Sequence, residues 1–431
     1  MMKDIQKVKT ALHAYAARMA AEGKFRAVDF VAYMEPVFRE AGFRATKPAG
    51  EIRKILLVRD DAAGDFVLFS PVIREIRRLY PKAHITLLVS SRNSGLAVSC
   101  PYVDDIIIDK LSFDTNYFPS IFNAELQLAE TLWEHDYDLA FAGRLGIRSG
   151  SLLLMYMAGI CERVGFTQNR SDPAGNFADL KWDCLLTLAV PFLPNAMHDV
   201  DRNLMLLENM LRLPVADREI EVWITDKDRQ AVTPLLQPLL SGGMKRILAV
   251  APTASVGKKR WPVERYQAVL KRILKKEKRT GLIILGGPED LAAGEKFAAA
   301  FGRRAISLAG RLSFSESAAA VEMASLYIGN DTGLMHVAAA LKKPVLSVNC
   351  FPLDVKMGYL SVPLRFVPYH VPSVTVFPAV RRGSCSDAWQ HGCGADEPHC
   401  ILNVTVETVL KGYEALLQKV KNGDNSPMFA K

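Results

Sequence analysis

The chain has 431 residues, of which 49% are hydrophobic and 23% charged, and its formal net charge is +8. This composition is that of an ordinary globular protein and excludes a disordered or fibrous chain, while the length predicts two or three domains. The positive charge favours an anionic partner such as a nucleotide, a phosphorylated lipid or nucleic acid, although a solvated basic surface also explains it.

The amino-terminal region lacks the apolar core of a secretory signal, since it carries Arg18 and Lys24 among its first 25 residues. The longest uncharged stretch, 149–161, is shorter than the roughly 20 residues of a membrane-spanning helix. We therefore expect a cytoplasmic protein, with peripheral contact at the inner face of the cytoplasmic membrane left open. The seven cysteines are expected to be reduced in that compartment.

Residues 1–50 predict a helical extension, because apolar residues recur at helical spacing over 11–21 and 30–43. Beyond it, strand-like runs alternate with amphipathic helices, which predicts a parallel sheet with helices on both faces. The predicted strands are 55–58, 85–89, 106–108 and 139–141, and the predicted helices are 66–79, 125–134, 149–161 and 198–213.

A second series of the same kind follows the glycines near residue 242. Its predicted strands are 247–251, 282–285, 306–308, 326–328 and 345–348, and its predicted helices are 265–275, 289–301, 315–323 and 334–341. The weak periodicity of 351–400 predicts a long irregular segment, and 404–420 predicts a final helix. Two similar α/β units also predict a ligand cleft between them.

The expected domains follow from this pattern. They are a helical extension (1–50), a first Rossmann-like domain (51–218), a second Rossmann-like domain (219–403), and a terminal helix and tail (404–431).

The first predicted strand is followed by Arg59-x-Asp61-x-x-Gly64-Asp65. Gly64 suits a tight turn, and Asp65 opens the next helix at the carboxyl end of a strand. A carboxylate there is a candidate general base toward a substrate hydroxyl. The alternative is that Asp61 or Asp65 only caps the helix, and spacing alone favours this cap.

Three strand ends in the second series carry polar or basic residues. A strand, a tight turn and a small-residue helix meet at 328–341, so the helix N-terminus there offers unpaired N–H groups to an anion. Lys259, which follows the first strand of this series, adds a point charge suited to phosphate. Together the three strand ends predict a nucleotide site. The alternative for each one alone is a structural role, as a helix cap or a basic surface turn. The candidate residues are Thr253, Ser255, Lys259, Glu289, Asp331, Thr332, Gly333 and His336.

Other residues have weaker signals. Asp226-x-Asp228 matches a metal-binding pattern, but Thr225 before an apparent helix favours capping. Arg144 and Arg148 follow a predicted strand and are candidates to hold an acidic acceptor, or are ordinary surface arginines.

The carboxyl-terminal cysteines raise the question of a metal. Cys350, Cys385, Cys393 and Cys400 could hold a structural zinc or iron ion, but their spacing lacks the short pairs of zinc ribbons. The alternative is buried free thiols.

These motifs together resemble glycosyltransferase family 9, the ADP-heptose heptosyltransferases with the GT-B fold, over about residues 52–410. The motifs that carry the resemblance are Arg59-x-Asp61-x-x-Gly64-Asp65, Ser70-Pro71, residues 76–81, Lys259-Arg-Trp261-Pro262, Gly286-Gly-Pro-Glu289 and Asn330-Asp-Thr-Gly333-x-x-His336. The extension and the long 351–400 segment depart from the usual pattern. Some members that modify proteins carry a four-cysteine iron site in this half, with a different spacing.

The resemblance implies a role for each matching residue. Asp65 matches the catalytic base, Lys259 the lysine on the donor diphosphate, and Glu289 the acidic residue that binds the nucleoside. The turn 331–333 matches the part that binds the sugar and diphosphate, whereas a usual threonine pair is replaced around Thr253 and Ser255.

The expected function is inverting transfer of heptose from ADP-heptose to a lipopolysaccharide core or related acidic glycan or glycolipid, without a catalytic cofactor. The alternatives are heptosyl transfer to a protein acceptor, or a non-catalytic binding or assembly protein on the same fold. We expect no nucleic-acid partner, and the helical extension leaves an oligomer open. A nicotinamide oxidoreductase is disfavoured, because no G-x-G-x-x-G follows the first strand.

Overall fold

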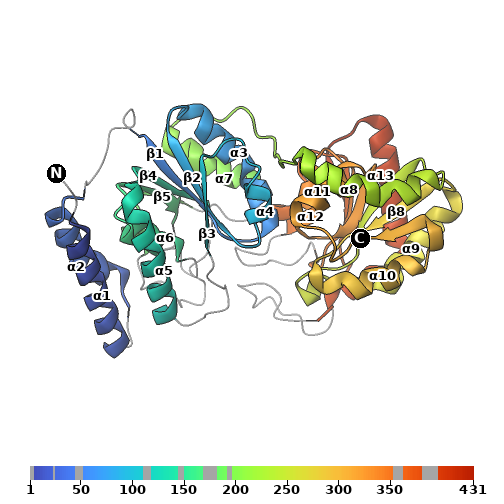
Figure 1. Ribbon diagram of the computed structural model, residues 1–431. Helices are drawn as coiled ribbons and strands as arrows, with labels where there is room; N and C mark the ends of the chain where they lie inside the picture. The colour runs from blue at the N-terminus through green and yellow to red at the C-terminus, as the bar shows by residue number, and fades with distance from the viewer. Residues whose placement is uncertain are drawn as a thin grey trace. The chain divides into compact units, whose positions relative to one another are not determined.

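The computed structural model describes residues 4–22, 25–43, 52–109, 118–143, 150–167, 182–191, 197–352, 363–380 and 397–431. The chain forms two compact units, each built around its own parallel sheet (Figure 1). The first unit comprises Met1–Ala62, Pro71–Leu193 and Val200–Arg218, and the second comprises Ala63–Ser70, Pro194–Asp199 and Glu219–Lys431.

Within the described residues, the sheet of the first unit has six parallel strands in the order β3-β2-β1-β4-β5-β6. The strands are β1 (Lys54–Arg59), β2 (His84–Ser90), β3 (Asp105–Asp109), β4 (Leu139–Ala142), β5 (Glu162–Phe166) and β6 (Leu188–Val190). Nearly all residues of β1, β2 and β4 are buried, as is typical of parallel strands covered on both faces. The four strands predicted for this unit are confirmed, whereas β5 and β6 were not predicted.

The helices of the first unit include the predicted amino-terminal pair. They are α1 (Ile5–Glu22), α2 (Ala27–Glu40), α3 (Ala63–Leu79), α4 (Ser94–Ala97), α5 (Phe118–Leu132), α6 (Ser151–Met157) and α7 (Asp199–Leu211), with short 3-10 helices at Trp133–His135 and Trp182–Leu185. The first two turns of α3 cluster with the second unit.

The amino-terminal helical pair is part of the core of the first unit. Figure 1 shows α1 and α2 lying outside α5 and α6. Tyr15 of α1 and Phe30 of α2 are buried with their ring centroids 4.8 Å apart, and both contact the ring of Phe122 on α5. The helices therefore form an extra layer that shares one hydrophobic cluster with the sheet.

The described part of the second unit has a seven-stranded parallel sheet in the order β13-β12-β11-β10-β7-β8-β9. Its strands are β7 (Arg246–Ala251), β8 (Thr280–Ile284), β9 (Ala305–Ser307), β10 (Leu326–Asn330), β11 (Val345–Val348), β12 (Ser373–Val376) and β13 (Pro427–Ala430). All five predicted strands are present. The prediction that 351–400 is irregular throughout is wrong, because β12 lies within it, and β13 was not predicted.

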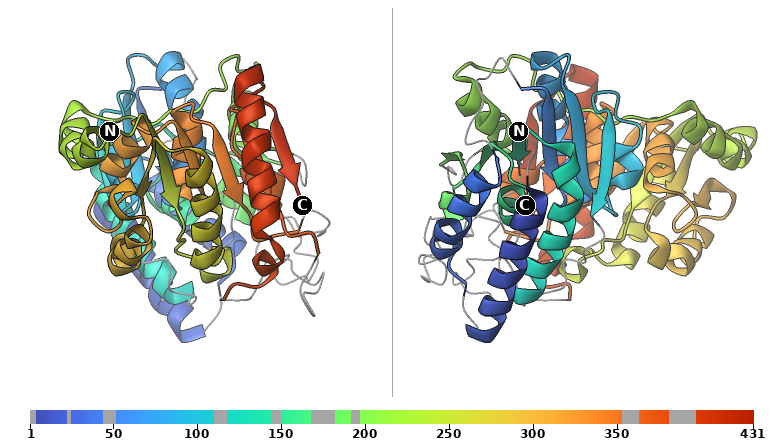
Figure 2. Two further views of the ribbon diagram at one scale, coloured as in Figure 1. Left: turned by 90° about the vertical axis from the view of Figure 1, so that its right-hand side faces the viewer. Right: turned by 60° about the vertical axis from the view of Figure 1, so that its left-hand side comes forward.

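Helices cover both faces of the second sheet. They are α8 (Asp226–Ser241), α9 (Val263–Lys276), α10 (Leu291–Ala299), α11 (Phe314–Glu322), α12 (Gly333–Ala340) and α13 (Val406–Asn422), with 3-10 helices at Gly257–Lys259, Pro288–Asp290, Gly302–Arg304, Pro363–Phe366 and Cys400–Asn403. Figure 2 shows α13 and α9 packed side by side on one face, where they share a hydrophobic cluster with the sheet. No helix in the described ranges is both long and apolar enough to cross a bilayer.

Both sheets are wound in the same way. The strand order reverses between β1 and β4 in the first unit, and between β7 and β10 in the second. In such doubly wound sheets, ligands bind beyond the carboxyl ends of the strands at this reversal. By this rule, ligand-binding residues are expected in the segments that follow β7 and β10, and in those that follow β1 and β4.

Candidate functional site

An ion pair joins the two segments at the strand reversal of the second unit. Lys259, which follows β7, donates from Nζ to Asp331 Oδ2 at 2.8 Å and to the Asp331 carbonyl oxygen at 3.3 Å. Burial alone would lower the pKa of Lys259, but the Asp331 carboxylate opposes burial, and the net pKa lies above its ordinary value. The ammonium group therefore stays charged, while 28% of the Lys259 side chain remains accessible.

The turn after β10 presents the amino end of α12 beside this ammonium group. Thr332 occupies the N-cap position with extended backbone, but its side chain makes no capping hydrogen bond. Its Oγ1 atom instead lies 3.3 Å from the hydroxyl of Tyr327. The N-terminal end of α12 therefore keeps the partial positive charge that attracts anions, next to the charge of Lys259.

His336 lies one turn into α12 and is buried, with 4% of its surface exposed. Burial, opposed by the Asp331 carboxylate and reinforced by the Lys259 ammonium, lowers the pKa of His336 to about 4. The ring is therefore neutral near pH 7. Among the described residues its Nδ1 atom is buried without a hydrogen-bond partner, so this nitrogen can accept from, or donate to, a ligand hydroxyl.

Gly64 is required for a different reason than the predicted tight turn. It lies inside α3 and is not among the glycines with positive φ. A Cβ atom at Gly64 would lie 2.7 Å from His336 Cδ2 and 3.3 Å from Gly333 Cα. The absent side chain thus allows a close approach of α3 to the start of α12 within the second unit.

Asp65 is in the first turn of α3, but it is not the N-cap residue of this helix. The N-cap residue is Ala62, whose side chain makes no capping hydrogen bond. The Oδ1 atom of Asp61 lies 3.0 Å from Arg59 Nε. Asp65 is one of the charges that raise the pKa of Lys259, after Asp331 and Cys350. Neither aspartate therefore occupies the N-cap position, and the role of Asp65 as a base remains a prediction.

The strand end after β8 has a capping residue that sequence reasoning missed. Asp290 Oδ2 accepts from the backbone N–H of Gly287 at 2.9 Å and from Thr253 Oγ1 at 2.8 Å. Asp290, rather than Glu289, therefore stabilises this turn, and the exposed Glu289 carboxylate is not used as the cap. Ser255 is exposed in the segment after β7.

By sequence, Pro262 fits the first position of a helix, but in the structure it lies one residue earlier. It is the N-cap of α9, and the helix begins at Val263. The proline therefore still marks the helix start, with its fixed φ just before the first turn.

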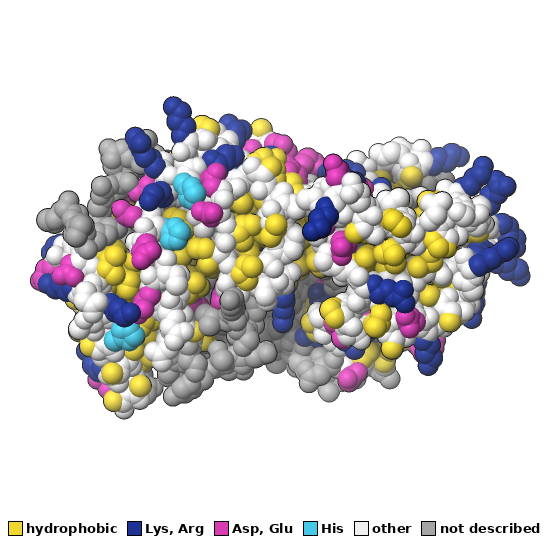
Figure 3. All heavy atoms as spheres, in the orientation of Figure 1, with side chains coloured by type: hydrophobic (Ala, Val, Ile, Leu, Met, Phe, Trp, Pro, Cys, Tyr) yellow, Lys and Arg dark blue, Asp and Glu magenta, His cyan; other side chains and the backbone are white. Residues whose placement is uncertain are grey.

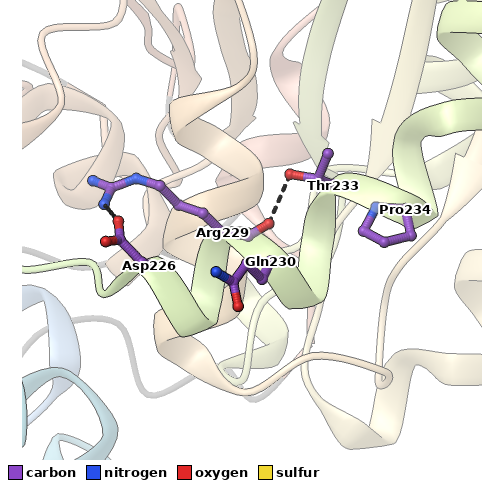
Figure 4. Close-up of a pocket in the computed structure, with 5 residues that line it drawn as sticks. All are labelled: Asp226, Arg229, Gln230, Thr233 and Pro234. Carbon is purple, nitrogen blue, oxygen red and sulfur yellow. Dashed lines mark hydrogen bonds and ion pairs between the residues drawn. The ribbon is translucent and has the colours of Figure 1, made fainter.

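The Asp226-x-Asp228 pattern serves capping, as predicted. Thr225 and Asp228 form a reciprocal capping box at the start of α8. A shallow pocket of about 390 Å³ lies on the same helix (Figure 4), lined by Asp226, Arg229, Gln230, Thr233 and Pro234. The Arg229 guanidinium there is already bonded to Asp226 and to Glu322 of α11. None of the predicted donor-binding residues lines this pocket.

Several other candidates do not contribute to the described site. Arg144, Arg148, Cys385 and Cys393 lie outside the described residues. Cys350 and Cys400 are buried, and no group of three metal-ligating side chains occurs in the described part of the chain.

His198 makes structural contacts. Its Nε2 atom is 2.8 Å from the carbonyl oxygen of Val367, and its ring packs on Tyr369.

A run of basic residues lies away from the strand ends described above. Figure 3 shows Lys and Arg side chains gathered on the second unit around α9, where six of the nine residues from 271 to 279 are basic. This run precedes β8 and therefore lies at the amino ends of the strands. The net charge of +8 is consequently weak evidence for a phosphate ligand, whereas the position of Lys259 is strong evidence.

Comparison with known proteins identifies the class of protein. Residues 126–350, just over half of the chain, match the family model for glycosyltransferase family 9 (heptosyltransferase). Lipopolysaccharide heptosyltransferase 2 of Escherichia coli strain K12 is 22% identical over 384 residues, which cover 84% of this chain and 98% of that protein. Lipopolysaccharide heptosyltransferase 3 of the same strain is 25% identical over 288 residues, which cover 66% and 79%.

Solved structures show the same fold. A glycosyltransferase family 9 protein from Veillonella parvula superimposes with a TM-score of 0.64 at 18% identity, covering 85% of this chain and 97% of that one. The E. coli ADP-heptose lps heptosyltransferase II gives a TM-score of 0.59 at 19% identity, covering 85% and 99%. The two parallel-sheet units are thus those of the GT-B glycosyltransferases, enzymes that use nucleotide-sugar donors. The chain belongs to glycosyltransferase family 9, the heptosyltransferase family, which confirms the resemblance stated from the sequence.

Proposed function

We propose that this protein transfers heptose from ADP-heptose, with inversion, to a lipopolysaccharide core or related acidic glycan at the inner face of the cytoplasmic membrane. Relatives that span most of the chain are named lipopolysaccharide heptosyltransferases, and one structure of the same fold is E. coli heptosyltransferase WaaC with ADP. The observation that carries the proposal is the Lys259 ammonium, bonded to Asp331 beside the amino end of α12.

In this scheme the second unit binds the donor. Lys259 and the first-turn N–H groups at Thr332 and Gly333 bind the diphosphate, and His336 Nδ1 bonds to a donor hydroxyl. Glu289 accepts hydrogen bonds from the nucleoside, with Thr253 and Ser255 lining the same segment. A fixed ammonium and a helix N-terminus stabilise charge that develops on a leaving group without rearranging during the reaction.

The first unit binds the acceptor, with Arg144 and Arg148 as the residues that hold its acidic groups. Asp65 removes the proton from the acceptor hydroxyl while the oxygen forms a bond to the anomeric carbon. The bond from that carbon to the diphosphate oxygen breaks on the opposite side, and ADP leaves with the electron pair. Charge stabilisation in this scheme comes from the chain's own groups, so no catalytic cofactor takes part.

The donor can be tested without knowledge of the acceptor. We expect ADP and ADP-heptose to raise the melting temperature and to bind in calorimetry, because a ligand that binds only the folded state stabilises it. UDP and GDP at equal concentration serve as matched controls. Equal stabilisation by all three nucleotides would contradict recognition of the base, and no stabilisation by any of them would contradict the donor site.

The acceptor requires a transfer assay. Purified protein is incubated with ADP-heptose and core-truncated lipopolysaccharide, and the mass of the lipid product is measured. We expect an added mass of one heptose. Transfer to a protein fraction instead would favour the protein acceptor, and donor binding without transfer to either acceptor would favour a non-catalytic role. Elemental analysis of the same sample decides between a structural zinc or iron ion and free thiols at the four cysteines.

A further inference from the structure

One buried side chain is bonded to both segments of the candidate donor site. Asn330 is the last residue of β10 and has no exposed surface. Its Oδ1 atom accepts from the backbone N–H of Trp261 at 3.1 Å and from the hydroxyl of Tyr266 at 3.0 Å. Its Nδ2 atom donates to the carbonyl oxygens of Pro252 at 2.9 Å and Thr253 at 3.3 Å. All four hydrogen-bonding positions of the amide are therefore occupied.

These partners lie at both ends of the segment that carries Lys259. Pro252 and Thr253 directly follow β7, and Trp261 comes two residues after Lys259. The Trp261 side chain is fully buried, and its indole N–H donates to the carbonyl oxygen of Val404 at 3.0 Å. The segment 252–261 is thus bonded at its start and its end to one amide, with Lys259 between these points.

Asn330 is also adjacent in sequence to the turn that begins α12. Asn330 immediately precedes Asp331, which bonds to Lys259, and Thr332, which is the N-cap. A shift of the Asn330 side chain would therefore change the separation between the ammonium and the helix N-terminus. Both groups are proposed to bind one diphosphate, so their separation determines whether they can do so together.

We infer that Asn330 is a positioning residue for the nucleotide-sugar donor: its amide sets the location of Lys259 relative to the amino end of α12 and does not itself contact the donor. This inference rests on the proposed function. Only a side-chain amide of this length satisfies two donors and two acceptors at once. An aspartate would place a carboxylate oxygen against two carbonyl oxygens, and a leucine would leave all four partners without a bond.

The test compares Asn330→Asp and Asn330→Leu with the wild-type protein. We expect ADP affinity in calorimetry to fall by about tenfold or more, and the donor KM to rise, while the acceptor KM is unchanged. Tyr266→Phe removes one of the four hydrogen bonds and keeps the ring, so its affinity should stay within about threefold of wild type.

A second control separates positioning from loss of stability. Leu416→Ala truncates a fully buried side chain on α13, remote in sequence from both segments, and lowers the melting temperature. We expect its ADP affinity to remain normal. A decrease in affinity that matches the loss of melting temperature in all the variants would overturn the inference.

A double-mutant cycle then shows whether Asn330 acts through Lys259. If it does, the double variant Asn330→Leu, Lys259→Ala should bind ADP little more weakly than Lys259→Ala alone. Fully additive losses would overturn the inference, as would normal ADP binding by Asn330→Leu. Failure of the wild-type protein to bind ADP would overturn the proposed donor and this inference together, so the two failures are distinguishable.

Discussion

The two sheets reverse their strand order in the same way, yet the cations at the two reversals are used differently. In the first unit the Arg59 side chain is 2% exposed, and its guanidinium donates to the Gly143 carbonyl oxygen and lies 3.0 Å from Asp61. In the second unit 28% of the Lys259 side chain stays accessible. The same topology thus places a cation at each reversal, but protein groups surround one and the other remains reachable by an anion. Topology determines where a site can form, and individual side chains determine its chemistry.

The largest expected effect comes from removing Asp65. Asp65→Ala should lower the transfer rate by about 10²- to 10⁴-fold, because the acceptor hydroxyl loses its base. ADP affinity should stay close to wild type, since the diphosphate contacts are elsewhere. Product formation by mass spectrometry and ADP binding by calorimetry measure the two effects, with Asp65→Asn as the isosteric control. Near-normal turnover of either variant would remove Asp65 from the role of base.

Low pH should affect the site at the second strand reversal and not the one at the first. Arg59 stays charged at every accessible pH, whereas His336 titrates. Its folded pKa of about 4 lies below the ordinary 6.5, so between these values the unfolded chain binds a proton that the folded chain does not. The contribution of the neutral His336 ring to the free energy of unfolding is therefore fully present above pH 6.5. As the pH falls to 4, the free energy of unfolding decreases by about 3 kcal/mol.

Urea unfolding at a series of pH values measures this loss. A His336→Asn variant should show a smaller decrease in the free energy of unfolding over the same interval than the wild-type protein. Parallel curves for the two proteins would show that another group causes the acid sensitivity.

Lys259→Ala tests whether the accessible cation binds the diphosphate. We expect ADP affinity to fall by about 10- to 100-fold, as for loss of a charge-assisted hydrogen bond. The neighbouring Lys258 is a matched control, because its ammonium lies over the ring of Phe351 rather than against Asp331. Lys258→Ala should bind ADP normally in calorimetry, and equal losses in the two variants would indicate a general charge effect.

The smallest expected effect is on stability alone. Thr225→Ala removes the capping box of α8 and should reduce the free energy of unfolding by about 1 kcal/mol. Donor affinity should be unchanged, with or without EDTA, because Asp226 and Asp228 serve a helix start rather than a metal. A divalent-ion dependence that disappears in this variant would restore the metal interpretation.

The fold was largely predictable because the strands of both units are continuous apolar runs between amphipathic helices. The exceptions have physical causes. Strand β5 carries a glutamate, an arginine and a glycine, and β6 and β12 are only three and four residues long, so periodicity gives them no clear signal.

The candidate site was predictable only in part. The structure brings Lys259, Asp331, Thr332, Gly333 and His336 together, as the strand-end argument expected. It could not be predicted that Gly64 is required by the ring of His336, because that contact joins segments far apart in the chain. The contacts of Asn330 and Asp290 were not predicted for the same reason, since their partners come from other strand ends.

The aromatic packing of the amino-terminal helices has a practical consequence for fragment design. Tyr15, Phe25 and Phe30 pack around Phe122, and Phe25 also contacts Trp182. An expression fragment that starts at residue 52 would leave Phe122 and Trp182 facing water and would be prone to aggregate. Residues 1–50 should therefore be retained in any recombinant version of this enzyme, and a fusion tag is better attached ahead of them than in their place.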